Sequence, residues 1–334
     1  MQAATIDRYG PADALILAEV PTPVPGPGEI LVRVHAAPVT TADWRLRAAV
    51  YPKGLRLIGR MVSGLTKPRH RIPGVDFAGT VTAIGAGVTR YAPGDRVFGF
   101  NGHGTHAEYV TVKAEGGVAH IPDALSFTEA AALPFGGDTA MCFLERFAGL
   151  KPGERLLVAG AAGNVGHLAV QVGKALGAEV TAMARPDAHP MLRALGADHV
   201  VDYTRRDVAR MGERWDVLFD PIHVLPYRRM RRAMAKGGRL LVVEGGVREM
   251  LQSLWPWRRG GRRVVFNVAM ASHESLTRLA AMAAAGQIRP VIGARLPLDR
   301  IADAHRIVET RRQRGITMLE IVPDAAEHSS PAAA

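Results

Sequence analysis

The sequence predicts an α/β protein of two domains, one β-rich and one built on a doubly wound parallel sheet. The chain has 334 residues, which fits two domains of ordinary size. Short alternating strands with proline and glycine turns fill the first third, and apolar strands alternate with helices from about residue 123. After about residue 270 the first pattern returns. We therefore predict a β-rich domain of residues 1–122 and 271–323 and an α/β domain of residues 123–270.

The first region is expected to be entirely β. Its pattern predicts strands such as Ile30–Ala36 and Thr80–Ile84, where apolar and polar residues alternate. Turns are expected at three motifs, Pro25-Gly26-Pro27-Gly28, Gly85-Ala86-Gly87 and Pro93-Gly94-Asp95.

The middle region begins with a helix, because Ser126 is followed three residues later by Glu129 in a capping-box pattern. Strands are then predicted at Leu156–Ala159, Glu179–Ala184, Val200–Asp202, Val217–Asp220 and Arg239–Val243, with helices at Gly166–Leu176, Pro190–Leu195 and Tyr227–Ala235. The last region is expected to hold a helix at Glu274–Ala285, strands near Pro290–Leu296 and Met318–Val322, and a disordered tail at 324–334.

Composition limits the environment and the partners. No run of about 18 apolar residues predicts a membrane span, no secretory signal opens the chain, and Cys142 is the only cysteine. These features favour a cytoplasmic protein. The net charge of +11 comes mainly from scattered arginines without interleaved aromatic residues. We therefore expect neither a nucleic-acid nor a membrane partner, although a positive surface attracts anionic cofactors.

The strongest motif is GAAGNVG, in which Gly160, Gly163 and Gly166 join a predicted strand to a predicted helix. Glycines at this spacing allow a tight turn, close approach of a pyrophosphate and close packing of the helix. The amino end of the helix offers free amides and partial positive charge to the anion. A bare βα turn also uses glycine, but the flanking strand and helix favour a Rossmann-type dinucleotide site.

The end of the second strand decides between the two nicotinamide dinucleotides. NAD-binding proteins place Asp or Glu there to bind the ribose 2′-hydroxyl. This chain has Ala184 followed by Arg185, a cation suited to a 2′-phosphate. The alternative is that Asp187 reaches the ribose if the loop is shaped differently. We predict NADPH.

At this point the chain resembles the zinc-independent, quinone oxidoreductase-like branch of the medium-chain dehydrogenase/reductase superfamily. The resemblance runs from PGPGEILVRV to about Val322 and includes IPGVDFAGTVTAIGAGV, PGDRVFGF, GTHAEYV, AAALPFGGDTA, LGADHVVDY and GQIRPVI. It implies a GroES-like catalytic domain formed by both chain ends and interrupted by the Rossmann domain. Members of the family are often dimeric, which leaves a homodimer as an open expectation.

The same resemblance argues against zinc. Zinc-dependent relatives place Cys where this chain has Thr40, and a His-Glu pair where it has Val75-Asp76. Valine cannot bind zinc, and a catalytic zinc needs three protein ligands. Without this Lewis acid, hydride transfer requires an electron-poor acceptor such as a quinone or an activated C=C bond of an enone or enal.

The resemblance also implies site residues in the cleft between the domains. Thr40 and Tyr51 are the expected hydrogen-bond donors, and His106 is either a proton donor or a packed histidine. Family members commonly carry Asn in place of Thr40, an aromatic residue in place of His106, and Lys in place of Ile316. The expected cofactor-binding residues are Thr139, Gly160, Ala161, Gly163, Asn164, Val165, Gly166, Arg185 and Tyr203.

Two other functions stay open. The substitutions at Thr40 and His106 are compatible with a non-enzymatic protein that senses NADPH and binds a partner or RNA. A reductase dedicated to one biosynthetic enone is the other alternative.

Overall fold

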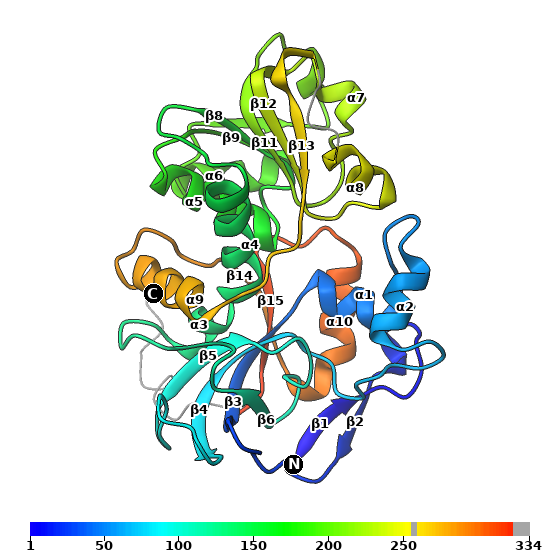
Figure 1. Cartoon of the computed structure of the whole chain (residues 1–334), viewed down its shortest axis with the longest axis vertical. Helices are drawn as coiled ribbons and strands as arrows, with labels where there is room; N and C mark the ends of the chain where they lie inside the picture. The colour runs from blue at the N-terminus through cyan, green and yellow to red at the C-terminus, as the bar shows by residue number, and fades with distance from the viewer. Residues whose placement is uncertain (255–258, 323–334) are drawn as a thin grey trace.

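The structure, a computed structural model, describes residues 1–254 and 259–322 and divides into two halves, each built on its own sheet (Figure 1). The predicted disordered tail at 324–334 lies outside the described residues. Within the described ranges, no helix combines the length and the apolar character that crossing a bilayer requires.

The upper half in Figure 1 is a six-stranded sheet in the order β10-β9-β8-β11-β12-β13, and all neighbouring strands are parallel. Its strands are β8 (Arg155–Val158), β9 (Glu179–Ala184), β10 (His199–Asp202), β11 (Trp215–Asp220), β12 (Met234–Val242) and β13 (Arg263–Phe266). The chain moves outward from β8 to β10 and then resumes on the other side with β11. This order confirms the doubly wound sheet and directs ligands to the carboxyl ends of β8 and β11.

The lower half is a seven-stranded sheet to which both ends of the chain contribute. Its order is β14-β15-β3-β4-β5-β7, with β6 also paired to β3. The strands are β3 (Glu29–Val39), β4 (Asp76–Ile84), β5 (Arg96–Phe100), β6 (Tyr109–Lys113), β7 (Gly117–His120), β14 (Ile292–Pro297) and β15 (Ile316–Glu320). A separate pair, β1 (Gln2–Thr5) and β2 (Ile16–Glu19), is antiparallel. Strand β15 lies antiparallel to β3, with Leu319 opposite Ala37, so the predicted return to the first sheet is confirmed. The boundaries at 122/123 and 270/271 stay predictions.

The prediction that the first region is entirely β was wrong, because it contains α1 (Thr41–Ala48) and α2 (Arg56–Ser63). Helix α1 begins with a reciprocal cap between Thr40 and Asp43. Helix α2 has Leu55 at its N-cap, which supplies no capping hydrogen bond, so no start signal marks it in the sequence.

The remaining helices are α3 (Phe127–Ala131), α4 (Thr139–Met141), α5 (Asn164–Ala175), α6 (His189–Ala194), α7 (Tyr227–Met230), α8 (Val247–Ser253), α9 (His273–Ala284) and α10 (Ile301–Glu309). The capping box at the start of α3 is confirmed, since the Glu129 amide donates to the Ser126 hydroxyl over 3.2 Å. Helix α7 ends earlier than predicted, because Met234 already pairs with Trp215 in the sheet. Helix α10 and strand β13 were not predicted.

One apolar cluster joins the two halves. It contains Leu156 and Val158 of the parallel sheet together with Ala36, Ala78 and Phe98 of the other sheet. All five side chains are buried. The two sheets are therefore held against each other by continuous hydrophobic packing.

Candidate functional site

Two adjoining cavities lie over the loop between β8 and α5, at the predicted edge of the parallel sheet. The larger cavity has a volume of about 400 Å³ and the smaller one about 230 Å³. They share five lining residues, Gly160, Gly163, Ile222, Arg311 and Gln313. The shared lining makes them two ends of one groove, which is the place where doubly wound sheets bind dinucleotides.

Each glycine of the loop has its own structural reason. Gly160 has a φ of +57°, which L side chains rarely adopt. A Cβ on Gly166 would overlap the Gly160 carbonyl oxygen and lie 2.7 Å from Ala161 Cα, so close packing requires glycine there. A Cβ on Gly163 would only touch the Gly160 oxygen at 3.4 Å. The protein itself does not demand glycine at Gly163, and the open space there suits a ligand that approaches the backbone.

The amino end of α5 faces this groove. Gly163 is its N-cap, and Asn164, Val165 and Gly166 form the first turn and line the smaller cavity. The amides of a first helical turn have no acceptor within the helix, and the helix dipole adds positive potential. The groove therefore carries a backbone anion site of the kind that holds a pyrophosphate.

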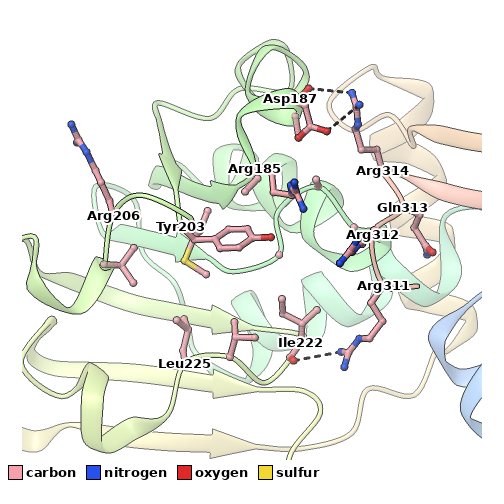
Figure 2. Close-up of a pocket in the computed structure, with 18 of the residues that line it drawn as sticks. Arg185, Asp187, Tyr203, Arg206, Ile222, Leu225, Arg311, Arg312, Gln313 and Arg314 are labelled. Atoms are coloured by element: carbon pink, nitrogen blue, oxygen red, sulfur yellow. Dashed lines mark hydrogen bonds and ion pairs between the residues drawn. The ribbon is translucent and has the colours of Figure 1, made fainter. Parts of the chain in front are cut away.

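The larger cavity is strongly basic. Figure 2 shows the Tyr203 ring and the side chains of Arg185 and Arg312 directed into one space, while Arg206 extends away from it. Arg185 follows the carboxyl end of β9, and Arg312 comes from the segment between α10 and β15. Among the described residues, neither Arg185 nor Arg312 has an acidic partner. Two unpaired guanidinium groups and a phenol are suited to bind a phosphate monoester.

The acidic side chains of the larger cavity are already paired. Arg314 binds Asp187 through its carboxylate, 3.1 Å away, and through its backbone carbonyl (Figure 2). Asp207 forms an ion pair with Arg229 at 2.9 Å. In the alternative in which Asp187 binds the ribose, the same carboxylate would be shared between the ribose and Arg314.

The smaller cavity lies between α1 and the segment after β12. Thr41 and Arg45, one turn apart on α1, line one side of it, and Glu244 lines the other. Glu244 accepts hydrogen bonds from Arg45 at 2.6 Å and from Arg311 at 2.9 Å. Burial lowers the pKa of Arg45, while Glu244 opposes that shift. This network places polar donors at the end of the groove farthest from Arg185.

The structure places Thr40 away from the groove. Its side chain is fully buried, and its hydroxyl donates to the Asp43 carboxylate over 2.7 Å. Thr40 acts as the cap of α1, so its hydroxyl is not presented to a substrate in this structure. The next residue, Thr41, is the one that lines the smaller cavity.

His106 is also fully buried and lines neither cavity. Its Nε2 lies 3.0 Å from the Pro38 carbonyl oxygen, and its ring meets the His305 ring edge-on at 6.0 Å. Burial lowers the pKa of His305 well below its usual value, and His106 adds to that shift. Of the two interpretations of His106, the packed histidine agrees with this environment better than the proton donor.

Tyr51 is half-buried beside α2 and is not part of either cavity lining. Its hydroxyl hydrogen-bonds with the Ser63 hydroxyl. Burial raises its pKa. The structure therefore does not bring Thr40, Tyr51 and His106 together at one point of the groove.

Most of the predicted cofactor-binding residues do lie at the groove. Seven of the nine line the groove, namely Gly160, Gly163, Asn164, Val165, Gly166, Arg185 and Tyr203. Ala161 is buried below the loop, and the Thr139 hydroxyl donates to the Phe135 carbonyl over 2.6 Å. Sequence reasoning missed Arg312, Arg45 and Glu244. The run ETRRQRG was a visible signal for Arg312, because it holds three arginines just before Ile316, where family members commonly carry a lysine.

The positions that hold zinc in the resembling enzymes do not offer a zinc site. Val75 is aliphatic and buried, and the Thr40 hydroxyl is committed to Asp43. Across residues 1–254 and 259–322, no group of three or more His, Cys, Asp or Glu side chains is placed to hold a metal ion. This donor set does not fit the metal.

Comparison with known proteins gives the family. A family model described as "Alcohol dehydrogenase GroES-like domain" matches residues 26–123, and one described as "Zinc-binding dehydrogenase" matches residues 195–317. The chain is 31% identical to NAD(P)H oxidoreductase RTN4IP1, mitochondrial, of Mus musculus, covering 96% of this chain and 89% of that protein. It is 30% identical to 2-methylene-furan-3-one reductase of Solanum lycopersicum, covering 97% and 80%.

A solved structure supports the same assignment. The quinone oxidoreductase from Coxiella burnetii superposes with a TM-score of 0.84 at 27% identity, over 96% of this chain and 99% of that chain. Fold, glycine loop and relatives agree on a nicotinamide cofactor and on oxidoreductase chemistry. The chain belongs to the medium-chain dehydrogenase/reductase superfamily, in its quinone oxidoreductase-like branch.

Proposed function

We propose that the chain is an NADPH-dependent, zinc-independent reductase of quinones or of activated C=C bonds in enones and enals. The observation that carries this proposal is the pair Arg185 and Arg312, which lack acidic partners among the described residues and face Tyr203 at the end of the groove.

The preference for NADPH follows from the charges around that end. A ribose 2′-phosphate would meet two guanidinium groups, and Asp187, an acid of the same lining, is paired with Arg314 at 3.1 Å. Charge-assisted bonds from arginine to phosphate are among the stronger polar contacts in proteins. Binding of a 2′-hydroxyl alone would leave both guanidinium groups without a partner.

The electrophile class follows from the smaller cavity. When bound, NADPH supplies a hydride. The chain must then stabilise negative charge that develops on the substrate oxygen, and it does so without a Lewis acid at the position of Thr40 and Val75. The Thr41 hydroxyl and the Arg45 guanidinium are the side-chain donors that α1 presents to this cavity. Two donors without a metal suit a substrate that is already electron-poor.

A non-enzymatic NADPH-binding role is the second candidate. It is favoured by one observation, namely that none of Thr40, Tyr51 and His106 reaches the groove. A reductase dedicated to one biosynthetic enone differs from the main proposal only in the breadth of substrates.

NADPH oxidation by the purified chain tests these candidates. Quinones, enones and enals should be reduced, whereas simple aldehydes and ketones should not, and a chelator should leave the rate unchanged. Tight NADPH binding without turnover of any acceptor would favour the sensing role. Turnover of simple ketones that a chelator abolishes would contradict the proposal.

A further inference from the structure

Helix α2 turns its apolar side chains toward the solvent, whereas an ordinary surface helix turns them toward the core. Its apolar residues Leu57, Ile58, Met61 and Val62, with Leu65 just beyond, are between 58% and 70% exposed. None of the eight residues of the helix is buried. A surface helix normally packs its apolar stripe against the core. The apolar side chains of α2 are instead exposed to solvent, as at a surface that binds a partner.

The opposite face of α2 is the one packed on the protein. A Cβ on Gly59 would overlap the Tyr51 ring, and the Arg60 guanidinium lies 4.3 Å from the centre of the Tyr9 ring. The Tyr9 hydroxyl donates to the Ser63 carbonyl over 2.8 Å. These specific polar and aromatic contacts fix the orientation of the helix. The outward direction of the apolar stripe is therefore a built feature and not the result of a loosely attached helix.

The charge around the stripe is of one sign. Residues 53–71 contain six basic residues and no Asp or Glu; the basic residues are Lys53, Arg56, Arg60, Lys67, Arg69 and Arg71. Arg71 pairs with Asp7 at 2.7 Å, and Arg60 is held by Tyr9. The other four are exposed and have no ion-pair partner within the part of the chain that the structure describes.

A second helix extends this side of the molecule. The Val247 amide at the start of α8 donates to the Lys53 carbonyl over 3.3 Å, so the loop before α2 touches the other half (Figure 1). Helix α8 also buries none of its residues, and Leu251 and Leu254 are 58% and 71% exposed. Exposed apolar side chains therefore occur on both helices, one in each half, next to the contact between Val247 and Lys53.

We propose that α2 and its basic surroundings dock on the surface of an anionic lipid bilayer, with the apolar stripe inserted among the headgroups. An outward apolar stripe flanked by lysine and arginine is the combination that interfacial helices use. A second copy of the chain fits less well, because a two-fold interface would place these unpaired basic residues against their own copies. Docking of this kind needs no membrane span, and it departs from the expectation of no membrane partner, which rested on the absence of a predicted span and on the scatter of the arginines.

Flotation of the purified full chain with vesicles tests the proposal without reference to turnover. We expect binding to vesicles of phosphatidylcholine mixed with phosphatidylglycerol, weak binding to phosphatidylcholine alone, and weaker binding at high salt. The double variant Leu57→Ser/Met61→Ser should bind the anionic vesicles at least about tenfold more weakly. Its thermal unfolding and NADPH affinity should match those of the wild type, because both side chains are exposed and neither lines the groove.

The matched control is Ile16→Ser/Val24→Ser, which removes two apolar side chains that are 60% and 85% exposed elsewhere on the surface. This variant should bind vesicles like the wild type. Absence of binding to anionic vesicles would overturn the proposal, as would equal loss in the two double variants. Concentration-dependent dimerisation that Leu57→Ser/Met61→Ser abolishes, without vesicle binding, would identify a second copy as the occupant instead. Binding of the full chain to an acidic protein, without binding to anionic vesicles, would identify a protein partner and would also overturn the proposal.

Discussion

Arg185 and Arg312 are the two side chains on which the proposed preference for NADPH depends. We expect Arg185→Ala to weaken NADPH binding by at least about tenfold and NADH binding by less than about twofold, because only NADPH carries the 2′-phosphate. Arg312→Ala should act in the same direction. Titration of both dinucleotides by calorimetry measures the difference.

The control for this pair is Arg206→Ala, a residue that also belongs to the lining of the larger cavity but whose side chain extends away from the space between Arg185 and Tyr203 (Figure 2). It should change the affinity for NADPH much less. Equal weakening of NADPH and NADH by Arg185→Ala would show that the arginine does not bind the 2′-phosphate.

Neighbouring threonines at the start of α1 have different expected roles. Thr40 caps the helix and is buried, whereas Thr41 lines the smaller cavity. Thr40→Val should lower the free energy of unfolding by about 1–2 kcal/mol with little change in turnover. Thr41→Val should lower turnover on a good enone by about tenfold or more, with unchanged stability.

Chemical denaturation and steady-state kinetics on both variants separate these effects. If Thr40→Val lost turnover while keeping its stability, the hydrogen-bond donor would be Thr40 as the sequence suggested. The sequence could not distinguish the two residues, because the helix can begin at either threonine. The one before the helix becomes its cap, and the next one can face the ligand.

At the level of elements, the loop before α5 carries two glycines with separable functions. Gly166→Ala should lower stability by several kcal/mol, since its Cβ would overlap the backbone of Gly160. Gly163→Ala should fold with near-normal stability, because its Cβ meets only one atom, at 3.4 Å. It should nonetheless bind either dinucleotide about tenfold more weakly, as the new methyl group occupies the approach of the pyrophosphate.

Thermal unfolding and dinucleotide titration of the two variants test this division. Normal affinity in Gly163→Ala would mean that the open space is not used by a phosphate.

Elements were predictable where local chemistry marks them. Strand β9 was predicted with the bounds that the structure shows, and the helix after Ser126 begins at its capping box. Helix α2 escaped prediction because no polar cap marks its start. Arg185 could be predicted because it follows a strand of the glycine motif. The arginine-rich run at 311–314 is visible in the sequence, but only the folded chain shows that it lines the same cavity as Arg185.

Across the whole molecule, α5 ties the two halves together through polar contacts. The His167 Nδ1 donates to the Gly163 carbonyl over 2.8 Å, and its Nε2 accepts from the Val291 amide over 3.0 Å, just before β14. Gln171 adds hydrogen bonds to the carbonyl and amide of Arg289, each 2.9 Å long. The His167 ring is fully buried and must be neutral to accept from Val291.

Burial lowers the pKa of His167 from 6.5 to about 4, which makes the stability of the fold depend on pH. The unfolded chain takes up a proton below pH 6.5 and the folded chain only near pH 4. The free energy of unfolding should therefore fall by about 3 kcal/mol from this residue as the pH drops from 6.5 to 4. The raised pKa of the buried Asp76 carboxyl acts in the opposite direction, because it favours the folded state as the pH falls toward 4.

Denaturant unfolding at a series of pH values isolates the histidine by comparison. His167→Gln should flatten the dependence between pH 6.5 and 4 relative to the wild type. Parallel curves for wild type and His167→Gln would contradict the assigned protonation state.

The apolar cluster shared by the two sheets restricts how the molecule can move. A hinge rotation wide enough to separate Leu156 and Val158 from Ala36, Ala78 and Phe98 would expose side chains that are now dry. Such a rotation is therefore costly, and we expect any opening of the groove to occur at its rim, where Glu244 forms ion pairs with both Arg45 and Arg311. Heat should then melt both halves in a single calorimetric transition, as one cooperative unit.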